Sequence, residues 1–308
     1  MALQSAPPRG PTKVGQGSTS EQQHPFELVE LEGRARRFDT PHAGGSMAWR
    51  AWGSGEPLVL VHGSHGCWTH WVRNIQALSQ NRMVIAADLP GHGDSSSPSE
   101  ESHEAISAAL ATGLTEVLKQ AGHAGGKADV AGFSFGGVIA GYFARWHPEL
   151  VRRLILIGVG GIGTPHGKVS LGRVGGLVGD ERRNAMKANL LGLMLHHPET
   201  VDDLAMHLLI ANATKARFKK IGELVVPDKL LIVLPQLKMP IDALWGEFDR
   251  PHPFAHEQEE VLRRYQPDMD FRVIEGAGHW AMYERPEAFN RALLAMLAAP
   301  VRAMRKHS

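Results

Sequence analysis

The stretch GFSFGG, residues 132–137, follows the apolar run ADVA and precedes VIAGYFARW. At its centre stands Ser134, with a glycine two positions away on either side. The flanking patterns predict a buried strand before the serine and a helix after it, joined by a tight turn. Such a turn holds the hydroxyl at the carboxyl end of a strand and at a helix N-terminus, which favours developing negative charge. The stretch therefore indicates a nucleophile at Ser134.

Apolar runs like the one before Ser134 recur along the chain and predict further buried strands, because they are short and end at or within two residues of a Gly or Asp. Counting the run that contains Ser134, the predicted strands are 57–63, 82–88, 128–134, 152–158, 241–247 and 270–276. Helical patterns separate most of them, at about 70–80, 102–121, 136–147, 254–265 and 286–298. This alternation predicts an α/β fold with a mostly parallel central sheet flanked by helices on both faces. FELVELEG (26–33) and SMAWRAWG (46–53) are candidates for an antiparallel edge.

One long interval interrupts this alternation. From about 164 to 236 the apolar residues have helical spacing, and the first strand-like segment is ELVVPDKLLIVLP, 223–235. Because the alternation resumes afterwards, we predict a helical insertion after the sixth strand rather than a separate domain. The core is then 25–163 and 237–308. Residues 1–24, rich in Pro, Gly, Ser and Gln, predict a disordered leader.

The composition excludes several classes of protein. A net charge of +1 gives no general attraction to nucleic acid or to anionic membranes. The single cysteine excludes intrachain disulfides and multi-cysteine metal sites. The chain has no HExxH motif. The glycine-rich GVGGIG (158–163) is explained better by the elbow and cap arrangement than as a phosphate loop, so neither a metal nor another cofactor is expected. With no apolar secretory signal and no membrane-spanning stretch, we expect a cytoplasmic protein that acts on a small molecule. Whether it forms a homo-oligomer stays open.

A serine nucleophile requires a base, and the base requires an acid that orients it. His279 follows the strand DFRVIEG, in a loop that would face Ser134. The acid is expected in the loop after the strand IDALWGE, where Asp249 is preferred because it lies beyond the strand end, ahead of two prolines. Glu247 is the alternative. Asp242 begins that strand, at the opposite end of the sheet.

An acyl-transfer site also requires donors for an oxyanion. VHGSHGCW directly follows the strand PLVLV, and we assign the backbone N–H groups of Ser64 and Phe135 to this role. Cys67, nearby, has no evident base and is expected to be a small buried residue. His65 and His207 are candidates for the substrate pocket.

HGSHG, DLPGHGDS, GFSFGG, LWGEFD and GAGHW together resemble the α/β-hydrolase superfamily over about residues 26–300. The resemblance implies that 164–236 is a cap and that the site lies between cap and core. Ser134 argues against the dehalogenases and epoxide hydrolases of this superfamily, which carry an aspartate there.

GHWAMYERPEAFN further resembles the hydrolases that cleave carbon-carbon bonds in ring-fission products of aromatic compounds. In that branch the Trp after the catalytic His lines the pocket, which implies this role for Trp280. Those enzymes carry Asn before the nucleophile, whereas this chain has Phe133. Those enzymes also hold the substrate carboxylate with an Arg on a cap helix. An approximate alignment places His207 or Leu208 of this chain at that position. Arg217, further along the chain, is a candidate to replace the missing Arg.

Three hypotheses follow. The first is a serine hydrolase of small to medium carboxylic esters that have an apolar or aromatic part. The second keeps Ser134, His279 and Asp249 but cleaves a carbon-carbon bond in a ring-fission product. The third is a small-molecule receptor of the same fold, which the complete set of catalytic residue types disfavours.

Overall fold

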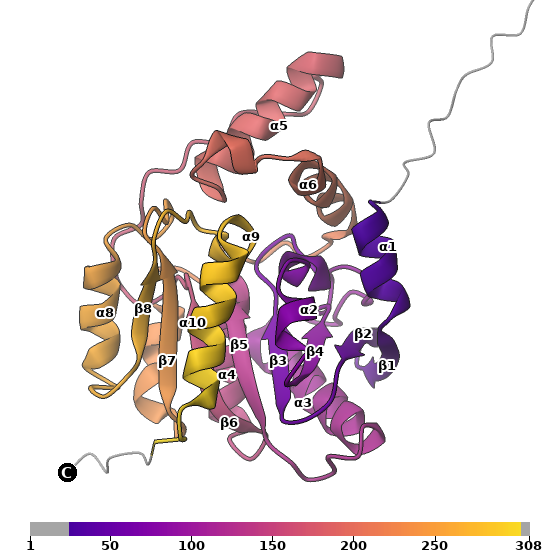
Figure 1. The fold of residues 1–308 in the computed structure, drawn as a ribbon, viewed down its shortest axis with the longest axis vertical. Helices are drawn as coiled ribbons and strands as arrows, with labels where there is room; N and C mark the ends of the chain where they lie inside the picture. Colours follow the sequence, from indigo (N-terminus) through magenta and orange to yellow (C-terminus); the bar gives the residue numbers. More distant parts are fainter. Residues whose placement is uncertain (1–24, 303–308) are drawn as a thin grey trace, which may run out of the picture.

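The computed structural model of the protein describes residues 25–302. Its centre is an eight-stranded sheet in the order β1-β2-β4-β3-β5-β6-β7-β8 (Figure 1). The strands are β1 (Arg36–His42), β2 (Gly45–Trp52), β3 (Pro57–Val61), β4 (Met83–Ala87), β5 (Ala128–Phe133), β6 (Val151–Ile157), β7 (Ile241–Gly246) and β8 (Phe271–Ile274). β3 to β8 are parallel, whereas β2 is antiparallel to both β1 and β4. The predicted mostly parallel sheet is confirmed, and the leader predicted at 1–24 lies outside the described residues.

The antiparallel edge differs in part from the prediction. SMAWRAWG supplies most of β2, but FELVELEG forms helix α1 (Phe26–Gly33) instead of a strand. The partner of β2 is β1, whose sequence RRFDTPH gave little strand signal. Leu28 and Leu31 of α1 are three residues apart and share one helix face, which packs on the core while Val29 is 56% exposed. A run this short fits both the helical and the strand period of apolar residues, and its packing decides which element forms.

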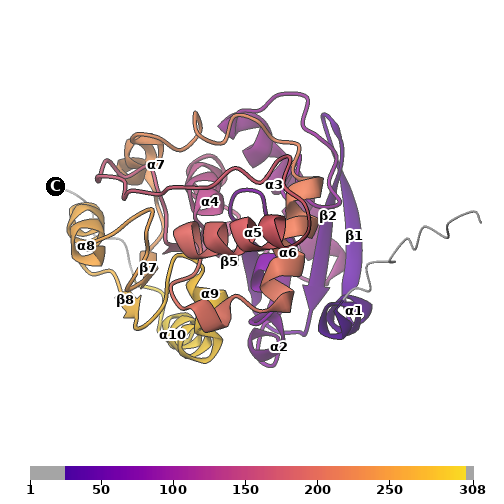
Figure 2. The ribbon, with the colours of Figure 1, turned by 90° about the horizontal axis from the view of Figure 1, so that it is seen from above.

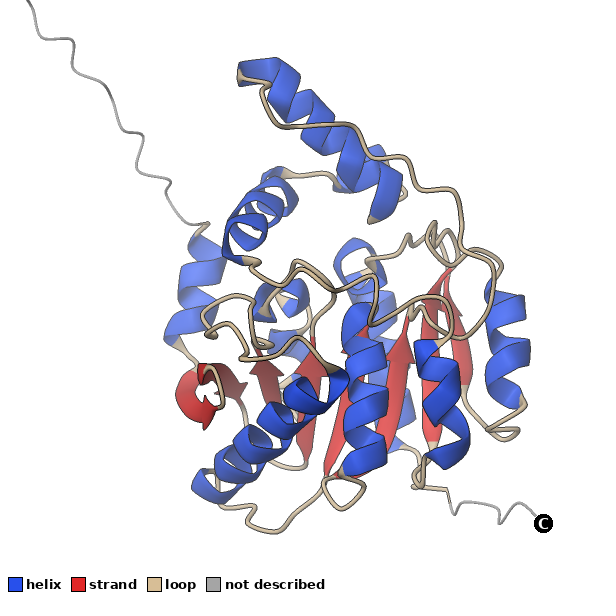
Figure 3. Ribbon diagram, turned by 180° about the vertical axis from the view of Figure 1, so that it is seen from behind, coloured by secondary structure: helices blue, strands red, loops and turns tan. Residues whose placement is uncertain are grey.

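Helices cover both faces of the sheet (Figures 1 and 3). α3 (His103–Gln120) and α4 (Phe135–Trp146) pack on one face together with Val59, whereas α2 (Ile75–Leu78) and α10 (Pro286–Ala298) pack on the other together with Leu60. Because successive strand residues point to opposite faces, each central strand is apolar throughout. The helix predicted at 70–80 is divided into the 3-10 helix η1 (Trp68–Trp71) and α2. The remaining core helices are α8 (Ala255–Arg263) and α9 (Ala281–Glu284).

The segment between β6 and β7 is helical. Its elements are α5 (Gly179–Leu193), η2 (Pro198–Thr200), α6 (Asp203–Lys215), α7 (Lys229–Val233) and η3 (Leu234–Gln236). α5 and α6 lie above the edge of the sheet where the parallel strands end (Figures 1 and 2). The strand-like segment 223–235 is therefore not a strand: Leu230 and Val233, three residues apart, are buried on one helix face that packs against α4. The boundaries 164 and 236 stay a prediction.

No helix within residues 25–302 combines the length and the apolar character needed to cross a bilayer.

Candidate active site

Ser134 occupies the sharp turn between β5 and α4. Its φ of 52° and ψ of −122° lie in a region that side chains rarely adopt. Its backbone N–H donates to the carbonyl oxygen of Ile157 at 2.8 Å, which ties the turn to the neighbouring strand. A Cβ at Gly136 would lie 2.2 Å from the carbonyl oxygen of His62, and one at Gly132 would lie 2.6 Å from the carbonyl oxygen of Gly136. The glycines are required because backbone passes on both sides of the serine.

His279 and Asp249 come from the loops that follow β8 and β7. The Nε2 atom of His279 lies 3.0 Å from Ser134 Oγ, and its Nδ1 atom lies 2.8 Å from Asp249 Oδ2. Gly158, at the end of β6, leaves room for this pair, because a Cβ there would lie 2.8 Å from Asp249 Oδ2. The structure therefore brings the three predicted side chains into one continuous row.

The carboxyl group of Asp249 is 2% exposed. Burial raises the pKa of Asp249, but the charges and hydrogen bonds of His279 and His252 outweigh it and hold the pKa below its ordinary value. The carboxylate therefore stays ionised at neutral pH. An ionised acceptor at Nδ1 favours the tautomer of His279 that carries its proton there, which leaves Nε2 free to accept the serine proton.

Two buried histidines hold the loop that carries Ser64. The imidazole of His62 bonds the carbonyl oxygen of Gly63 at 2.7 Å and accepts from the N–H of Leu89 at 2.9 Å. The Nδ1 atom of His70 accepts from the N–H of Gly63 at 3.3 Å. Burial lowers the pKa of His62 to about 4 and the pKa of His70 well below its ordinary value, so both rings are neutral acceptors at pH 7. No sequence pattern indicated His70, which reaches Gly63 only through the packing of η1.

A cavity of about 230 Å³ adjoins the serine. It is lined by core and insertion residues: Ser64, Phe133, Ser134, Phe135, Gly160, His166, Leu193, Met194, Ile221, Gly222, Val225, Val226, Pro251, His252 and His279. Among the described residues, no Lys, Arg, Asp or Glu lines this cavity. Ser64 and Phe135 both border it, and the role of their N–H groups stays a prediction.

The predicted pocket residues divide into two groups. Phe133 lines the cavity. Trp280, His65 and His207 are not among the lining residues of this cavity. Trp280 is buried behind it, where its indole N–H donates to the carbonyl oxygen of His70 at 3.0 Å. His207 borders another cavity, of about 460 Å³, beside α1.

The cavity beside α1 contains an ion-pair network. Arg50, almost fully buried, contacts Asp88 and Asp94, and Lys215 lies 2.8 Å from Asp94. Asp88 also accepts from the backbone N–H of Trp68 at 2.8 Å. The two aspartates thus connect the loop after β4 with α6 of the insertion, away from Ser134.

The alternative residues have other partners. Glu247 accepts from the N–H of Gly276 at 2.8 Å. Burial raises the pKa of the Cys67 thiol to about 12, so it carries no thiolate at neutral pH. The guanidinium of Arg217 donates to the carbonyl oxygen of Ser95, and its side chain is exposed outside the cavity. We therefore do not assign Arg217 as an anion clamp.

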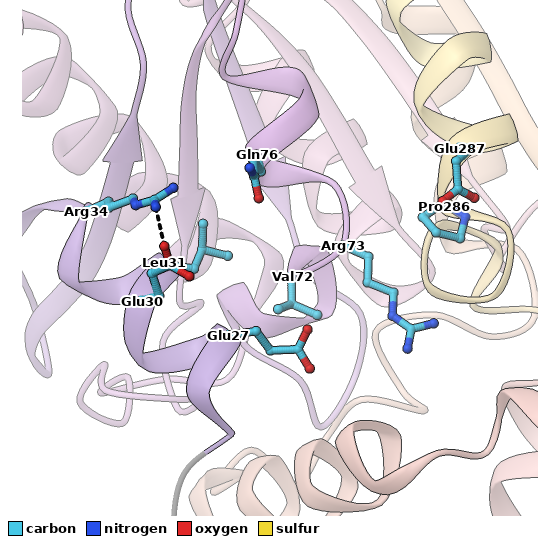
Figure 4. Close-up of a pocket in the computed structure, with 9 residues that line it drawn as sticks. All are labelled: Glu27, Glu30, Leu31, Arg34, Val72, Arg73, Gln76, Pro286 and Glu287. Atoms are coloured by element: carbon cyan, nitrogen blue, oxygen red, sulfur yellow. Dashed lines mark hydrogen bonds and ion pairs between the residues drawn. The ribbon is translucent and has the colours of Figure 1, made fainter.

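A further surface cavity, of about 360 Å³, lies between α1, α2 and α10 (Figure 4). Its lining residues are Glu27, Glu30, Leu31, Arg34, Val72, Arg73, Gln76, Pro286 and Glu287. Figure 4 shows Arg34 and Glu30 paired with each other. Because this lining contains no Ser, Cys or His, the cavity is not part of the candidate site.

Glu284 connects the loop of His279 with the insertion. Its buried carboxylate accepts from the N–H of Gly278 at 2.6 Å, and from the N–H groups of His196 at 2.9 Å and His197 at 2.7 Å. The hydroxyl of Thr200 donates to the same carboxylate at 2.9 Å. One carboxylate therefore holds the loop of His279 and the turn after α5 together.

A comparison with protein families decides the affiliation of the chain. The model of the alpha/beta hydrolase family matches residues 58–292, which include Ser134, Asp249 and His279. The chain belongs to this family.

Relatives of this chain are named for different reactions. The chain is 30% identical over 259 residues to a 2-hydroxy-6-oxononadienedioate/2-hydroxy-6-oxononatrienedioate hydrolase of Burkholderia vietnamiensis, covering 79% of this chain and 87% of that protein. It is 29% identical over 294 residues to a dihydrolipoyllysine-residue acetyltransferase component of the acetoin cleaving system of Pseudomonas putida, covering 92% of this chain and 72% of that protein. A thermophilic esterase from Thermogutta terrifontis is similar in structure, with a TM-score of 0.64, 26% identity and coverage of 85% of this chain and 98% of that chain. The predicted hydrolase fold is confirmed.

Proposed function

We propose that this protein is a serine esterase of small carboxylic esters with an apolar or aromatic part. The observation that supports this substrate class is the cavity beside Ser134. Among the residues that the structure describes, its lining is mostly apolar and includes no Lys or Arg to hold a substrate carboxylate. Its volume of about 230 Å³ is smaller than that of a pocket for a drug-sized ligand, roughly 300–1,000 Å³. A short acyl group and a small alcohol fit these limits.

The reaction proceeds in two acyl transfers. Ser134 Oγ attacks the ester carbonyl carbon while its proton moves to His279 Nε2, and Asp249 stabilises the resulting imidazolium. The N–H groups of Ser64 and Phe135 hold the oxyanion. The carbon-oxygen bond of the ester then breaks, and the departing alkoxide takes the proton from His279. Water, deprotonated by the same imidazole, then attacks the acyl carbon. The bond between that carbon and Ser134 Oγ breaks, Ser134 Oγ takes the proton back from His279, and the carboxylic acid is released.

A substrate panel tests this proposal. We expect p-nitrophenyl acetate and butyrate to be hydrolysed with a kcat/KM well above that of the palmitate ester, because the cavity volume is small. Ser134→Ala provides the control: it should abolish turnover and also prevent labelling by a fluorophosphonate probe. Equal labelling of the wild type and Ser134→Ala would disprove the role of this serine.

The second candidate is cleavage of a carbon-carbon bond in a ring-fission product, which the similarity to the Burkholderia vietnamiensis enzyme supports. In this chemistry the same three residues act on a vinylogous ketone. A 2-hydroxy-6-oxo dienoate is therefore included in the panel. Efficient cleavage of the dienoate beside negligible ester hydrolysis would replace our first choice by this one.

A further inference from the structure

A third buried side chain, His252, stands beside Asp249 and has no part in the proposed reaction. Its backbone N–H donates to Asp249 Oδ1 at 2.9 Å, and its Nδ1 atom lies 3.5 Å from the same oxygen. His252 is 5% exposed, and its Nδ1 atom is buried without a hydrogen-bond partner. A buried imidazole nitrogen that faces a carboxylate at this distance can serve as a metal ligand.

Asp249, His252 and His279 together offer one ligand atom each, all within 4.8 Å of one another. Zn²⁺ binds imidazole nitrogen and carboxylate oxygen at about 2.0–2.2 Å, so ligand atoms around one tetrahedral ion are roughly 3.4 Å apart. The 3.5 Å between His252 Nδ1 and Asp249 Oδ1 matches this spacing. His279 Nδ1 lies 2.8 Å from the other carboxylate oxygen, Oδ2, and this hydrogen bond is lost when the ion binds His279 Nδ1 and Asp249 Oδ1.

We propose that Asp249, His252 and His279 form a binding site for a divalent transition-metal ion such as Zn²⁺, and that the bound ion inhibits the enzyme. Three protein ligands leave a fourth position for water. Both imidazoles border the cavity, which gives the ion a path to the site.

The ligand types suit a metal. Imidazole nitrogen and carboxylate oxygen are ligands that Zn²⁺ binds in proteins. When the ion binds His279 at Nδ1, the single proton of that ring moves to Nε2, so the site requires no net loss of protons.

Inhibition follows from the position of the ring proton on His279 in the metal-bound form, and this step rests on the proposed function. When the ion takes the lone pair of His279 Nδ1, the ring proton resides on Nε2. Nε2 then becomes a donor and does not accept the proton of Ser134 Oγ. The ion also removes the acceptor that Asp249 provides to the imidazole.

The full-length protein, first stripped with a chelator, is titrated with Co²⁺ and followed by the visible absorption of the bound ion. Zn²⁺ inhibition of ester hydrolysis is measured in parallel. We expect one ion per chain and inhibition that a chelator reverses. His252→Phe keeps the ring volume and the backbone bond to Asp249, and should weaken both effects at least about tenfold. His256→Phe, on the exposed face of α8, is the matched control and should change neither.

Co²⁺ binding that is unchanged in His252→Phe would overturn the proposal, as would binding that is lost in His256→Phe. If His252→Phe does not fold, Asp249→Asn tests the same site and should also lose the ion. Ser134→Ala should bind Co²⁺ as the wild type does, which separates the metal site from the proposed reaction. Binding without inhibition would retain the site and refute its effect on catalysis.

Discussion

Gly158→Ala perturbs the candidate triad without altering any of its members. The added Cβ would lie 2.8 Å from Asp249 Oδ2, whereas ordinary contact with a Cβ begins near 3.4 Å. The carboxylate must therefore retreat by roughly 0.6 Å, the difference between these two distances. Its 2.8 Å bond to His279 Nδ1 then lengthens beyond normal hydrogen-bond range.

The expected loss follows from the energy of that bond. A hydrogen bond to a charged group contributes about 1.5–3 kcal/mol, and each 1.36 kcal/mol corresponds to about a factor of ten in rate. We expect kcat for p-nitrophenyl acetate to fall by roughly tenfold to a hundredfold. Because the φ of Gly158 is +50°, alanine also strains the backbone, by about 1–2 kcal/mol, and thermal unfolding should shift down accordingly.

Gly122→Ala is the matched control. The φ of Gly122 is +85°, but no atom lies within 4 Å of its Cβ position. This variant should lose similar stability and keep its kcat. The reasoning is refuted if folded Gly158→Ala retains activity within twofold of the wild type, or if both variants lose activity equally.

Three more predictions concern single side chains. Asp249→Asn should lower kcat by about 10⁴-fold, because the amide no longer favours the tautomer of His279 with its proton on Nδ1. Steady-state kinetics will measure this loss, and a loss under tenfold contradicts the assigned role of Asp249. His70→Phe keeps the ring but leaves the N–H of Gly63 without its acceptor, which should cost about 1–3 kcal/mol in urea unfolding and reduce kcat. Burial lowers the pKa of His62 to about 4 from an ordinary 6.5. The unfolded chain therefore takes up this proton at a higher pH than the folded protein does. The contribution of the neutral His62 ring to the free energy of unfolding is fully present above pH 6.5 and is lost as the pH falls toward 4. The loss should approach about 3 kcal/mol, and wild-type stability should decline more steeply than that of His62→Asn between pH 7 and 4.5.

Features set by local pattern could be predicted from the sequence. Strands such as PLVLV are continuous in apolar residues because both faces of the sheet are covered, and the turn around Ser134 has glycine where backbone passes closely. Asp249 and His279 follow from the rule that carboxyl ends of parallel strands share one edge.

Features set by packing could not be predicted in this way. The short segment FELVELEG fits both a helical and a strand period, so only its contacts identify α1. His252 approaches Asp249 because the turn between them folds back. His207 faces the cavity beside α1 because of how α6 packs, which the spacing of its apolar residues leaves undetermined.

The carboxylate of Glu284 has a mechanical consequence. A movement that lifts His196 and His197 away from the sheet must break their bonds to Glu284 or pull the neighbouring loop, and with it His279, out of alignment. Opening at this side of the insertion therefore either costs these hydrogen bonds or displaces His279 from Ser134. Engineering for bulkier substrates is best directed at Ile221, Val225 and Val226, which border the cavity from the other end of the insertion.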